Sequence, residues 1–202
     1  MRGRWSSRAA VLLTAVLGLV SVPLVVAAPA QALDACTTRT LSKPFSQWGD
    51  TNDYFAVTSG GFESTSGWTY GSGVTRVAEN EPWHVSGNGS YSLKIPAGAT
   101  ATAPEMCVTS TEDSMRFFAK GPAGSGPTLV MNMKVTNTST RQVWNGSFTF
   151  YMTSGSGWIA MPRIQLPNLT GTTGTDNVAI SFTSQGATWQ IDDVYVDPSR
   201  TR

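Results

Sequence analysis

Apolar and polar residues alternate with a period of two over much of the chain, which predicts β-strands rather than helices. The clearest alternating runs lie at residues 91–95, 129–136, 148–152 and 178–182. Beyond the first 32 residues, no stretch places apolar residues at i, i+3, i+4 and i+7 over three turns. We therefore expect no long helix.

Shorter candidate strands are residues 54–57, 68–70, 74–78, 83–85, 106–108, 115–119, 158–161, 164–166 and 189–197. Gly87-Asn88-Gly89 and Asn145-Gly146 are interpreted as tight turns between strands, because Gly and Asn tolerate positive φ. Roughly nine to eleven short strands with turns between them predict an all-β fold, an antiparallel β-sandwich of the jelly-roll type, with a barrel as the alternative.

The domain is expected to span residues 54–198, after an irregular lead-in at 33–53 and before a short tail at 199–202. Within the lead-in, Phe45 and Trp48 are the expected anchors over the core. No repeat of fixed period is present, which argues against a propeller or solenoid.

The first 32 residues have the layout of a secretory signal peptide. Three arginines fall within the first eight residues, an apolar run follows at residues 9–28, and small residues surround Ala30 and Ala32. We expect cleavage after Ala32, with cleavage after Ala30 as the alternative, and a secreted product. An uncleaved membrane anchor is the second interpretation, which Pro23 inside the apolar run disfavours.

Removal of this segment changes the net charge. The chain carries 14 Lys and Arg against 13 Asp and Glu, and residues 1–32 hold three of the basic residues and none of the acidic ones. The remainder has 14 − 3 = 11 basic against 13 acidic groups, a net charge of −2. Because it also lacks a Lys/Arg cluster, we expect no nucleic-acid partner.

Cys36 and Cys107 are the only cysteines, and an exported chain meets an oxidising environment, so one disulfide is expected. The alternative is a lipidated Cys36, because residues 33–36 loosely resemble a bacterial lipoprotein box. Asp34 within that box, the gap from the apolar run and the unpaired Cys107 that would remain all argue against lipidation.

Three motifs together resemble the landmarks of jelly-roll carbohydrate-binding modules and related galactose-binding-like domains. They are Gly60-Gly61-Phe62-Glu63 with Gly67-Trp68, Gly87-Asn88-Gly89-Ser90-Tyr91-Ser92-Leu93, and Ile191-Asp192-Asp193-Val194. The cysteine pair, Asn80-Glu81-Pro82, Arg116-Phe117-Phe118-Ala119 and the ending at 189–198 are similar to a group of exported actinobacterial proteins. The resemblance covers residues 54–198 and implies a jelly-roll sandwich that binds carbohydrate.

The resemblance also implies a structural Ca²⁺ that joins the start of the domain to its last strand. Its ligands would be Glu63, one of Asp192 and Asp193, and backbone oxygens around Gly61 and Ser90, a set that suits the oxygen preference of Ca²⁺. We favour Asp192 over Asp193. The alternative is that these carboxylates accept hydrogen bonds from loop amides without a metal.

Six tryptophans remain after residue 32, a high number for one domain. Aromatic faces stack on the apolar faces of sugar rings, and polar side chains bind the hydroxyls. Because Trp83, Trp144 and Trp158 adjoin turns, we expect them to line a glycan-binding cleft, with Tyr70 and Arg116 as accessory groups. The alternative places tryptophans in the core, which we favour for Trp68 and Trp189.

The sequence offers little support for an enzyme. His84 is the only histidine, and neither a G-x-S-x-G nor an H-E-x-x-H motif is present. Asp192 and Asp193 are adjacent on a predicted strand, so they would point to opposite faces and not act as a glycosidase pair. We therefore expect a secreted, non-catalytic glycan-binding domain; the alternative is a secreted or envelope-associated protein-interaction domain without a small ligand.

Overall fold

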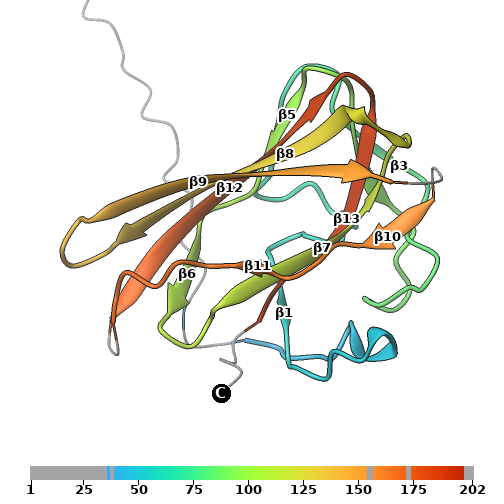
Figure 1. Cartoon of the computed structure of the whole chain (residues 1–202). Coiled ribbons are helices and arrows are strands. Elements are labelled where there is room, and N and C mark those ends of the chain that lie inside the picture. Colours follow the sequence, from blue (N-terminus) through green and yellow to red (C-terminus); the bar gives the residue numbers. More distant parts are fainter. Residues whose placement is uncertain (1–35, 37–38, 154–156, 172–173, 198–202) are drawn as a thin grey trace, which may run out of the picture. The chain divides into compact units, whose positions relative to one another are not determined.

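The computed structural model describes residues 36, 39–153, 157–171 and 174–197, which form two antiparallel β-sheets packed face to face (Figure 1). All of them belong to the unit Gln31–Arg202. The predicted signal peptide at 1–32 and the tail at 199–202 lie outside the described residues. Within these residues the helical content is the 3₁₀ helix η1 (Ser46–Trp48), and no helix has the length and hydropathy to cross a membrane.

One sheet contains seven strands in the order β10-β7-β13-β4-β3, with β1 beside β13 and β11 beside β7. Its strands are β1 (Phe55–Ala56), β3 (Thr75–Val77), β4 (Ser92–Ile95), β7 (Ser114–Lys120), β10 (Trp158–Ala160), β11 (Ile164–Gln165) and β13 (Trp189–Asp197).

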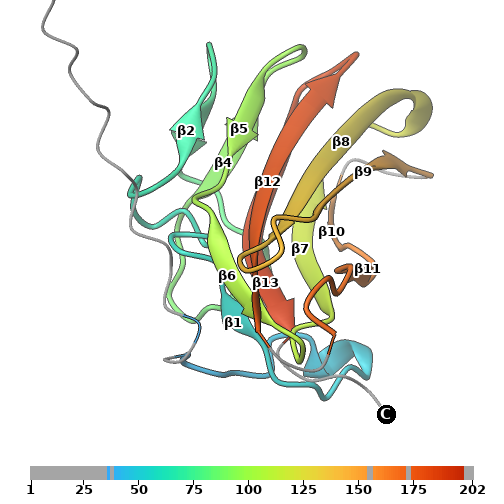
Figure 2. The same cartoon turned by 90° about the vertical axis from the view of Figure 1, so that its left-hand side faces the viewer.

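The other sheet contains six strands in the order β2-β5-β12-β8-β9, with β6 beside β12. Its strands are β2 (Thr69–Tyr70), β5 (Thr100–Thr102), β6 (Met106–Thr109), β8 (Gly124–Asn137), β9 (Val143–Met152) and β12 (Thr175–Gln185). Figure 2 shows β5, β12 and β8 side by side in one layer, with β7 and β13 in the layer behind.

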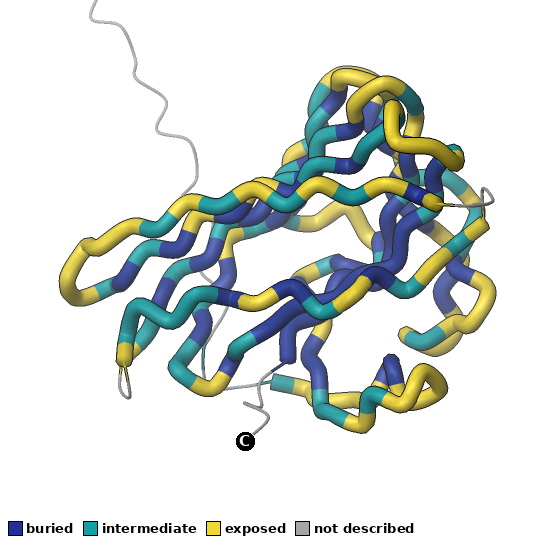
Figure 3. The backbone as a smooth tube through the Cα atoms, viewed as in Figure 1, coloured by how far each residue is buried: buried dark blue, intermediate teal, exposed yellow. Residues whose placement is uncertain are grey.

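The main hydrophobic core lies between the two sheets. Alternate residues of β8 and β12 face inward, among them Met131, Ile180 and Phe182, and they meet Phe117 and Ile191 from the seven-stranded sheet. All five are at most 1% exposed. Figure 3 shows the same alternation as dark blue positions along the central strands. The predicted β-sandwich of the jelly-roll class is therefore confirmed.

A second, smaller hydrophobic cluster covers the outer face of the seven-stranded sheet. Phe45 and Tyr54 from the lead-in pack there against Phe118 of β7 and Tyr195 of β13. Phe45 stacks on Phe118 at 5.4 Å between ring centroids and meets Tyr54 edge-on at 4.9 Å. The lead-in thus gives the seven-stranded sheet a second apolar layer.

The predicted disulfide between Cys36 and Cys107 is confirmed, with a Cα–Cα distance of 5.2 Å. It attaches the start of the lead-in to β6 of the six-stranded sheet. Nearby, the Arg39 guanidinium donates a hydrogen bond to the carbonyl of Cys107 and lies 3.8 Å from the ring centroid of Phe55 in β1. The lead-in therefore contacts both sheets.

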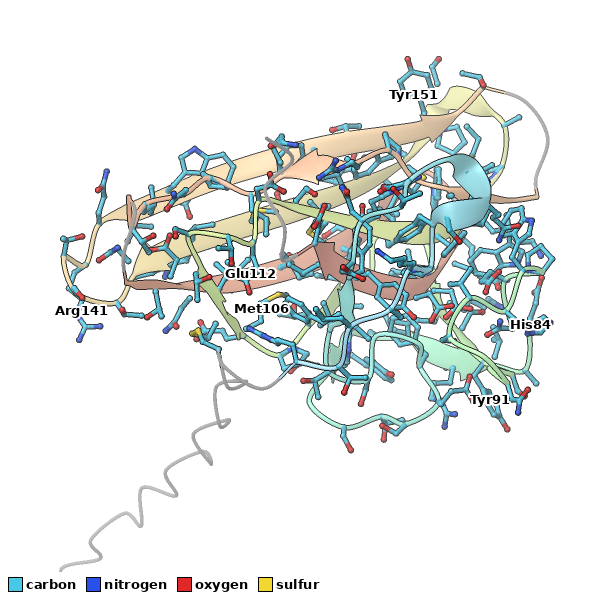
Figure 4. All side chains as sticks on the ribbon, turned by 90° about the horizontal axis from the view of Figure 1, so that it is seen from below. His84, Tyr91, Met106, Glu112, Arg141 and Tyr151 are labelled. Carbon is cyan, nitrogen blue, oxygen red and sulfur yellow. A yellow bond between two sulfur atoms is a disulfide. The ribbon has the colours of Figure 1, made fainter. Side chains whose placement is uncertain are left out.

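Two local predictions from the sequence are wrong, and side-chain chemistry explains the first. Trp83–Val85 is a turn rather than a strand, because the Glu81 carboxylate accepts the amide hydrogens of Trp83 and Val85. Tyr91 does not face the core with Leu93: it is 36% exposed, and its ring lies 4.1 Å from the Arg76 guanidinium. Figure 4 shows Tyr91 directed away from the sheets.

The predicted Asn145-Gly146 turn is also wrong. Both residues lie inside β9 and pair with Lys134 and Met133 of β8. The reversal comes at residues 138–141 instead, where Asn137 Oδ1 accepts the amides of Ser139 and Thr140. Asn145-Gly146 is therefore part of a strand rather than a turn. The strand β5 was not predicted at all.

Candidate functional site

Three tryptophans gather on the outer face of the seven-stranded sheet, around Phe118. Trp48 is the last residue of η1, Trp83 lies in the turn at 81–85, and Trp158 begins β10. Trp48 and Trp83 meet edge-on with ring centroids 5.0 Å apart, and they lie 5.4 and 5.5 Å from Phe118. Each is 37% exposed, whereas Trp158 is half-buried against the same cluster. We call Trp48, Trp83, Trp158 and Phe118 the aromatic surface.

The position of Trp83 is set by a buried carboxylate. Glu81 is fully buried, and its two oxygens accept the amide hydrogens of Trp83 at 2.5 Å and Val85 at 2.7 Å. Its own amide donates to Asp192 Oδ2 at 3.1 Å. These bonds link the turn to β13, so the indole of Trp83 is presented by a hydrogen-bonded scaffold rather than by a free loop.

A polar cavity of about 620 Å³ adjoins the aromatic surface at Trp48. Its lining residues are Trp48, Gly49, Asp50, Thr51, Asn52, Arg116 and Arg163. The Arg116 guanidinium donates to Asp50 Oδ2 at 2.9 Å and to the carbonyl of Met161 at 3.0 Å, and it lies 4.2 Å from the ring centroid of Phe45. Arg116 is thereby held in one orientation at the cavity wall.

The remaining charges of this cavity are also paired. Arg163 Nη2 donates to Asp197 Oδ2 at 2.6 Å, and Asn52 Nδ2 donates to the same oxygen at 3.0 Å. Burial alone would raise the pKa of Asp50, but hydrogen bonds from Tyr54, Asn52 and Arg116 lower it below its usual value. The wall therefore offers fixed donors and acceptors with no excess of positive charge.

Of the predicted glycan-binding residues, Trp83, Trp158 and Arg116 lie on one face, whereas Trp144 and Tyr70 are not part of it. Trp144 of β9 and Tyr70 of β2 are on the six-stranded sheet and pack against the main core. The indole of Trp144 leans over Gly146, where an added Cβ would come within 2.0 Å of the ring. Sequence reasoning missed Asp50, Asn52 and Arg163, which carry no local motif.

A second hollow, of about 510 Å³, lies on the outer face of the six-stranded sheet. Hydroxyl, amide and ammonium side chains line it, from Thr102, Asn132, Lys134, Asn145, Ser147 and Ser181. No aromatic residue is among its lining residues. It offers hydrogen bonds to a ligand but no ring on which a sugar could stack.

The two adjacent aspartates of β13 are both buried, at 0% and 1% exposure. The expected alternation of faces fails here, because Asp193 has a φ of 48° and the pairing with β7 shifts register between Asp192 and Tyr195. Asp192 Oδ1 accepts the amide of Asp193 and its Oδ2 accepts that of Glu81. Burial first, and the charge of Asp193 second, raise the pKa of Asp192 to about 9.

Asp193 is less well satisfied than Asp192. Its Oδ2 is buried and has no hydrogen-bond partner. Burial, and then the charges of Glu81 and Glu63, raise its pKa to about 7 against the opposing effect of the Ser86 hydroxyl. Gly61 faces it, and a Cβ there would lie 2.9 Å from Asp193 Oδ1. An acidic oxygen without a donor and beside other acids is a favourable position for a cation.

The predicted calcium ligand Glu63 lies at the same place, on a loop beside Ser90. Its Oε1 accepts the amides of Ser90 and Tyr91 at 2.8 and 2.9 Å. Asn80 Oδ1 is a second buried oxygen without a partner, and a Cβ on Gly89 would lie 2.7 Å from it. Among the described residues, no group of three or more His, Cys, Asp or Glu side chains is arranged to hold a metal. Carboxylate, amide and main-chain oxygens are nevertheless the ligand types that Ca²⁺ takes in proteins.

No family model matches the sequence, and no curated protein matches it. Solved structures with a similar trace include TmCBM61 bound to β-1,4-galactotriose, at 21% identity and a TM-score of 0.46, covering 71% of this chain and 98% of that one. The C-terminal family 22 carbohydrate-binding module of Clostridium thermocellum Xyn10B is similar at 15% identity and a TM-score of 0.41, covering 70% of this chain and 93% of that one. The enzymatically active domain of bacteriophage CBA120 tailspike protein 4 is similar at 16% identity and a TM-score of 0.45, covering 70% of this chain and 21% of that one. At these identities and TM-scores the similarities assign no function to this chain.

Proposed function

We propose that this chain is a non-catalytic module that binds glycan at the aromatic surface and the adjoining cavity. The observation that carries the proposal is the pair Trp48 and Trp83, each 37% exposed and 5.0 Å apart, beside a cavity of about 620 Å³. Exposed indoles held on a rigid scaffold suit the apolar face of a sugar ring, and stacking there costs little conformational entropy.

The cavity supplies the polar part of such a site. Arg116 and Asp50 present fixed, paired charges, and Asn52 adds an amide whose nitrogen donates to Asp197. Sugar hydroxyls both donate and accept, so a wall that contains guanidinium, carboxylate and amide groups fits them. The charge balance of the wall favours a neutral saccharide.

The proposal is tested by affinity electrophoresis in gels that contain soluble polysaccharide, with xylan and β-1,4-galactan as the first two probes. Wild-type protein is expected to be retarded, and the double variant Trp48→Ala/Trp83→Ala is expected to lose roughly tenfold or more in affinity, because two stacking partners are removed. The matched control is Asn132→Ala/Ser181→Ala in the hollow of the six-stranded sheet, which should bind like wild type.

Two outcomes contradict the proposal. Loss of retardation in the control but not in the tryptophan variant would place binding on the six-stranded sheet. Absence of binding across a wide glycan array, together with capture of a protein by crosslinking, would favour the protein-interaction alternative.

We further propose a Ca²⁺ held by Asp193, Glu63 and Asn80, with main-chain oxygens completing the shell. The unpartnered buried oxygens of Asp193 and Asn80 support it. Both oxygens of Asp192 already accept amides, so Asp193 is the ligand that we now favour of the two. Metal analysis of extensively dialysed protein tests this: about one Ca²⁺ per chain supports it, and no retained or rebound Ca²⁺ contradicts it.

We also propose that residues 1–32 direct export and are removed. The three early arginines, the apolar run and the small residues near Ala32 support this, as does a disulfide, which forms in oxidising compartments. N-terminal sequencing of protein from the medium tests it. A start at Leu33 or Gln31 is expected, and a retained chain that begins at Met1 would contradict the proposal.

A further inference from the structure

The strand β9 is a long edge strand in a molecule whose other sheet edges are short. The seven-stranded sheet ends in β10 and β3, each of 3 residues, and the six-stranded sheet ends on one side in β2, of 2 residues. β9 ends the other side and has 10 residues. Among the described residues, β9 pairs with β8 and, at Met152, with Ala123, which directly precedes β8, so its other edge has no strand partner. Short edges are a common protection against pairing with another chain, and β9 lacks it.

The composition of β9 offers no other protection. Residues 143–152 contain no charged residue and no proline, the two devices that most often block an edge. On the outer face Val143 is 46% and Tyr151 55% exposed, and Figure 4 shows Tyr151 directed away from the sheets. On the inner face Trp144 and Phe148 are only half-buried. The strand therefore carries apolar side chains on both faces and unpaired backbone groups along its edge.

We propose that β9 pairs antiparallel with β9 of a second copy of this chain, about a two-fold axis at Ser147. A two-fold pair is self-complementary, so each contact occurs twice. In this register large apolar residues meet one another on both faces, and the smallest residue meets an aromatic ring. The pairs are Val143 with Tyr151, Trp144 with Phe150, Asn145 with Thr149, Gly146 with Phe148, and Ser147 with Ser147 of the second copy.

Gly146 leaves room for an aromatic contact in this register. The Trp144 indole occupies the space above Gly146, where a Cβ would clash with it at 2.0 Å. In the proposed pair, Phe148 of the second copy lies opposite Gly146. Its ring therefore contacts the Trp144 indole that covers Gly146. Cross-strand aromatic pairs of this kind stabilise sheets. A shift by one residue would place exposed polar side chains against the half-buried inner face.

Pairing through β9 joins the two six-stranded sheets into one continuous sheet. The hollow on the outer face of each copy is lined in part by Asn145, Gly146 and Ser147, so the two hollows meet at the axis. The aromatic surface is on the other sheet and stays uncovered. The inference therefore does not depend on glycan binding, and either proposal can fail while the other holds.

Charge reversal across the axis tests the register. In β8, Lys134 pairs with Asn145, so a glutamate at 145 is tolerated within one copy. Asn145→Glu/Thr149→Glu sets Glu against Glu twice across the axis, whereas Asn145→Glu/Thr149→Lys sets Glu against Lys twice. The expected result is a dimer for wild type and for the Glu/Lys variant, and a dimer about tenfold weaker for the Glu/Glu variant. The readout is sedimentation velocity over a range of concentrations, with circular dichroism to confirm the fold of each variant.

Disulfide trapping gives a second, independent readout. Ser147→Cys places two thiols directly opposite each other, at a Cα separation suited to a disulfide. Thr149→Cys lies on the same exposed face, but its thiols would be four residues apart along the strand, roughly 13 Å. Ser147→Cys should therefore form covalent dimer under mild oxidation, and Thr149→Cys should not. A chain that stays monomeric at all concentrations, a dimer that is insensitive to the Glu/Glu change, or equal trapping at both positions would overturn the inference.

Discussion

At the scale of single residues, Asp193 is the most informative position, because it combines burial, backbone strain and an unsatisfied oxygen. Its φ of 48° is in the left-handed region, where Asn and Asp are the best tolerated residues after Gly. The positive φ also explains why alternation along β13 misassigned the two aspartates. A period-two pattern carries no information about a bulge, so the sequence located the acidic pair but not which member keeps an oxygen without a donor.

The order of stability of Asp193→Asn and wild type is expected to reverse when calcium is added. In chelator at pH 8 the variant should be the more stable protein by on the order of a few kcal/mol, because a buried carboxylate is removed. With Ca²⁺ present, wild type should gain stability and the variant should not, because it lacks a ligand. Thermal melts under both conditions are the measurement, and an equal response to Ca²⁺ in the two proteins would contradict the site.

The pH dependence of stability follows from the same pair. The pKa values of Asp192 and Asp193 rise from 3.8 in the unfolded chain to about 9 and about 7 in the folded protein. Between pH 4 and these values the folded state holds more protons, so the free energy of unfolding falls as pH rises, by at most about 1.4 kcal/mol per pH unit for each proton. Urea unfolding in chelator at pH 5 and pH 8 measures it. A higher stability at pH 8 would show that the pKa values are not raised.

At the scale of elements, the turn at 81–85 and the lead-in illustrate what local patterns omit. Trp83–Val85 has the aromatic and β-branched composition of a strand. The fully buried Glu81 nevertheless fixes it as a turn, because its carboxylate accepts hydrogen bonds from two backbone amides. The long strands β8 and β12 were predicted because their period-two pattern is sustained. The error at Asn145-Gly146 arose because a turn signal is short-range, whereas nine of the ten residues of β9 pair with β8.

Glu81→Gln tests the role of this turn. The change keeps the side-chain shape but leaves one acceptor oxygen for two amides, so the turn should loosen and Trp83 should be less well held. Glycan affinity is expected to fall about tenfold while the sandwich remains folded. Isothermal titration calorimetry measures the affinity, and Glu105→Ala, at an exposed acid distant in sequence, is the control. Unchanged glycan affinity in Glu81→Gln would show that the turn at 81–85 does not contribute to binding.

The disulfide has a clear expected effect on stability. It closes a loop with a sequence separation of 71 residues, and removal of such a link costs about 4 kcal/mol in the chain-entropy account. Cys36→Ser/Cys107→Ser should lower the urea midpoint accordingly, and reductant should lower that of wild type to the same value. A loss below about 1 kcal/mol would indicate that contacts of the lead-in, such as Arg39 with Phe55, hold it without the covalent link.

At the scale of the whole molecule, the two sheets separate two roles. The seven-stranded sheet carries the aromatic surface and the acidic cluster, and the six-stranded sheet carries the free edge of β9. The sandwich class follows from alternation and turn spacing, whereas the described residues form thirteen strands rather than the nine to eleven expected. The place of Trp48 beside Trp83 and Arg116 did not follow from these patterns, because the lead-in, the turn and the strand that carry these residues are brought together by the sheet order.

The central claim is that glycan binds at the aromatic surface, and indole N–H chemical shifts in a ¹⁵N-labelled sample test it most directly. On titration with a saccharide that the protein binds, the resonances of Trp48 and Trp83 should shift in a saturable way, whereas that of Trp144 should stay in place. The opposite result, saturable shifts at Asn132, Ser147 and Ser181 with both exposed indoles unchanged, would contradict the claim.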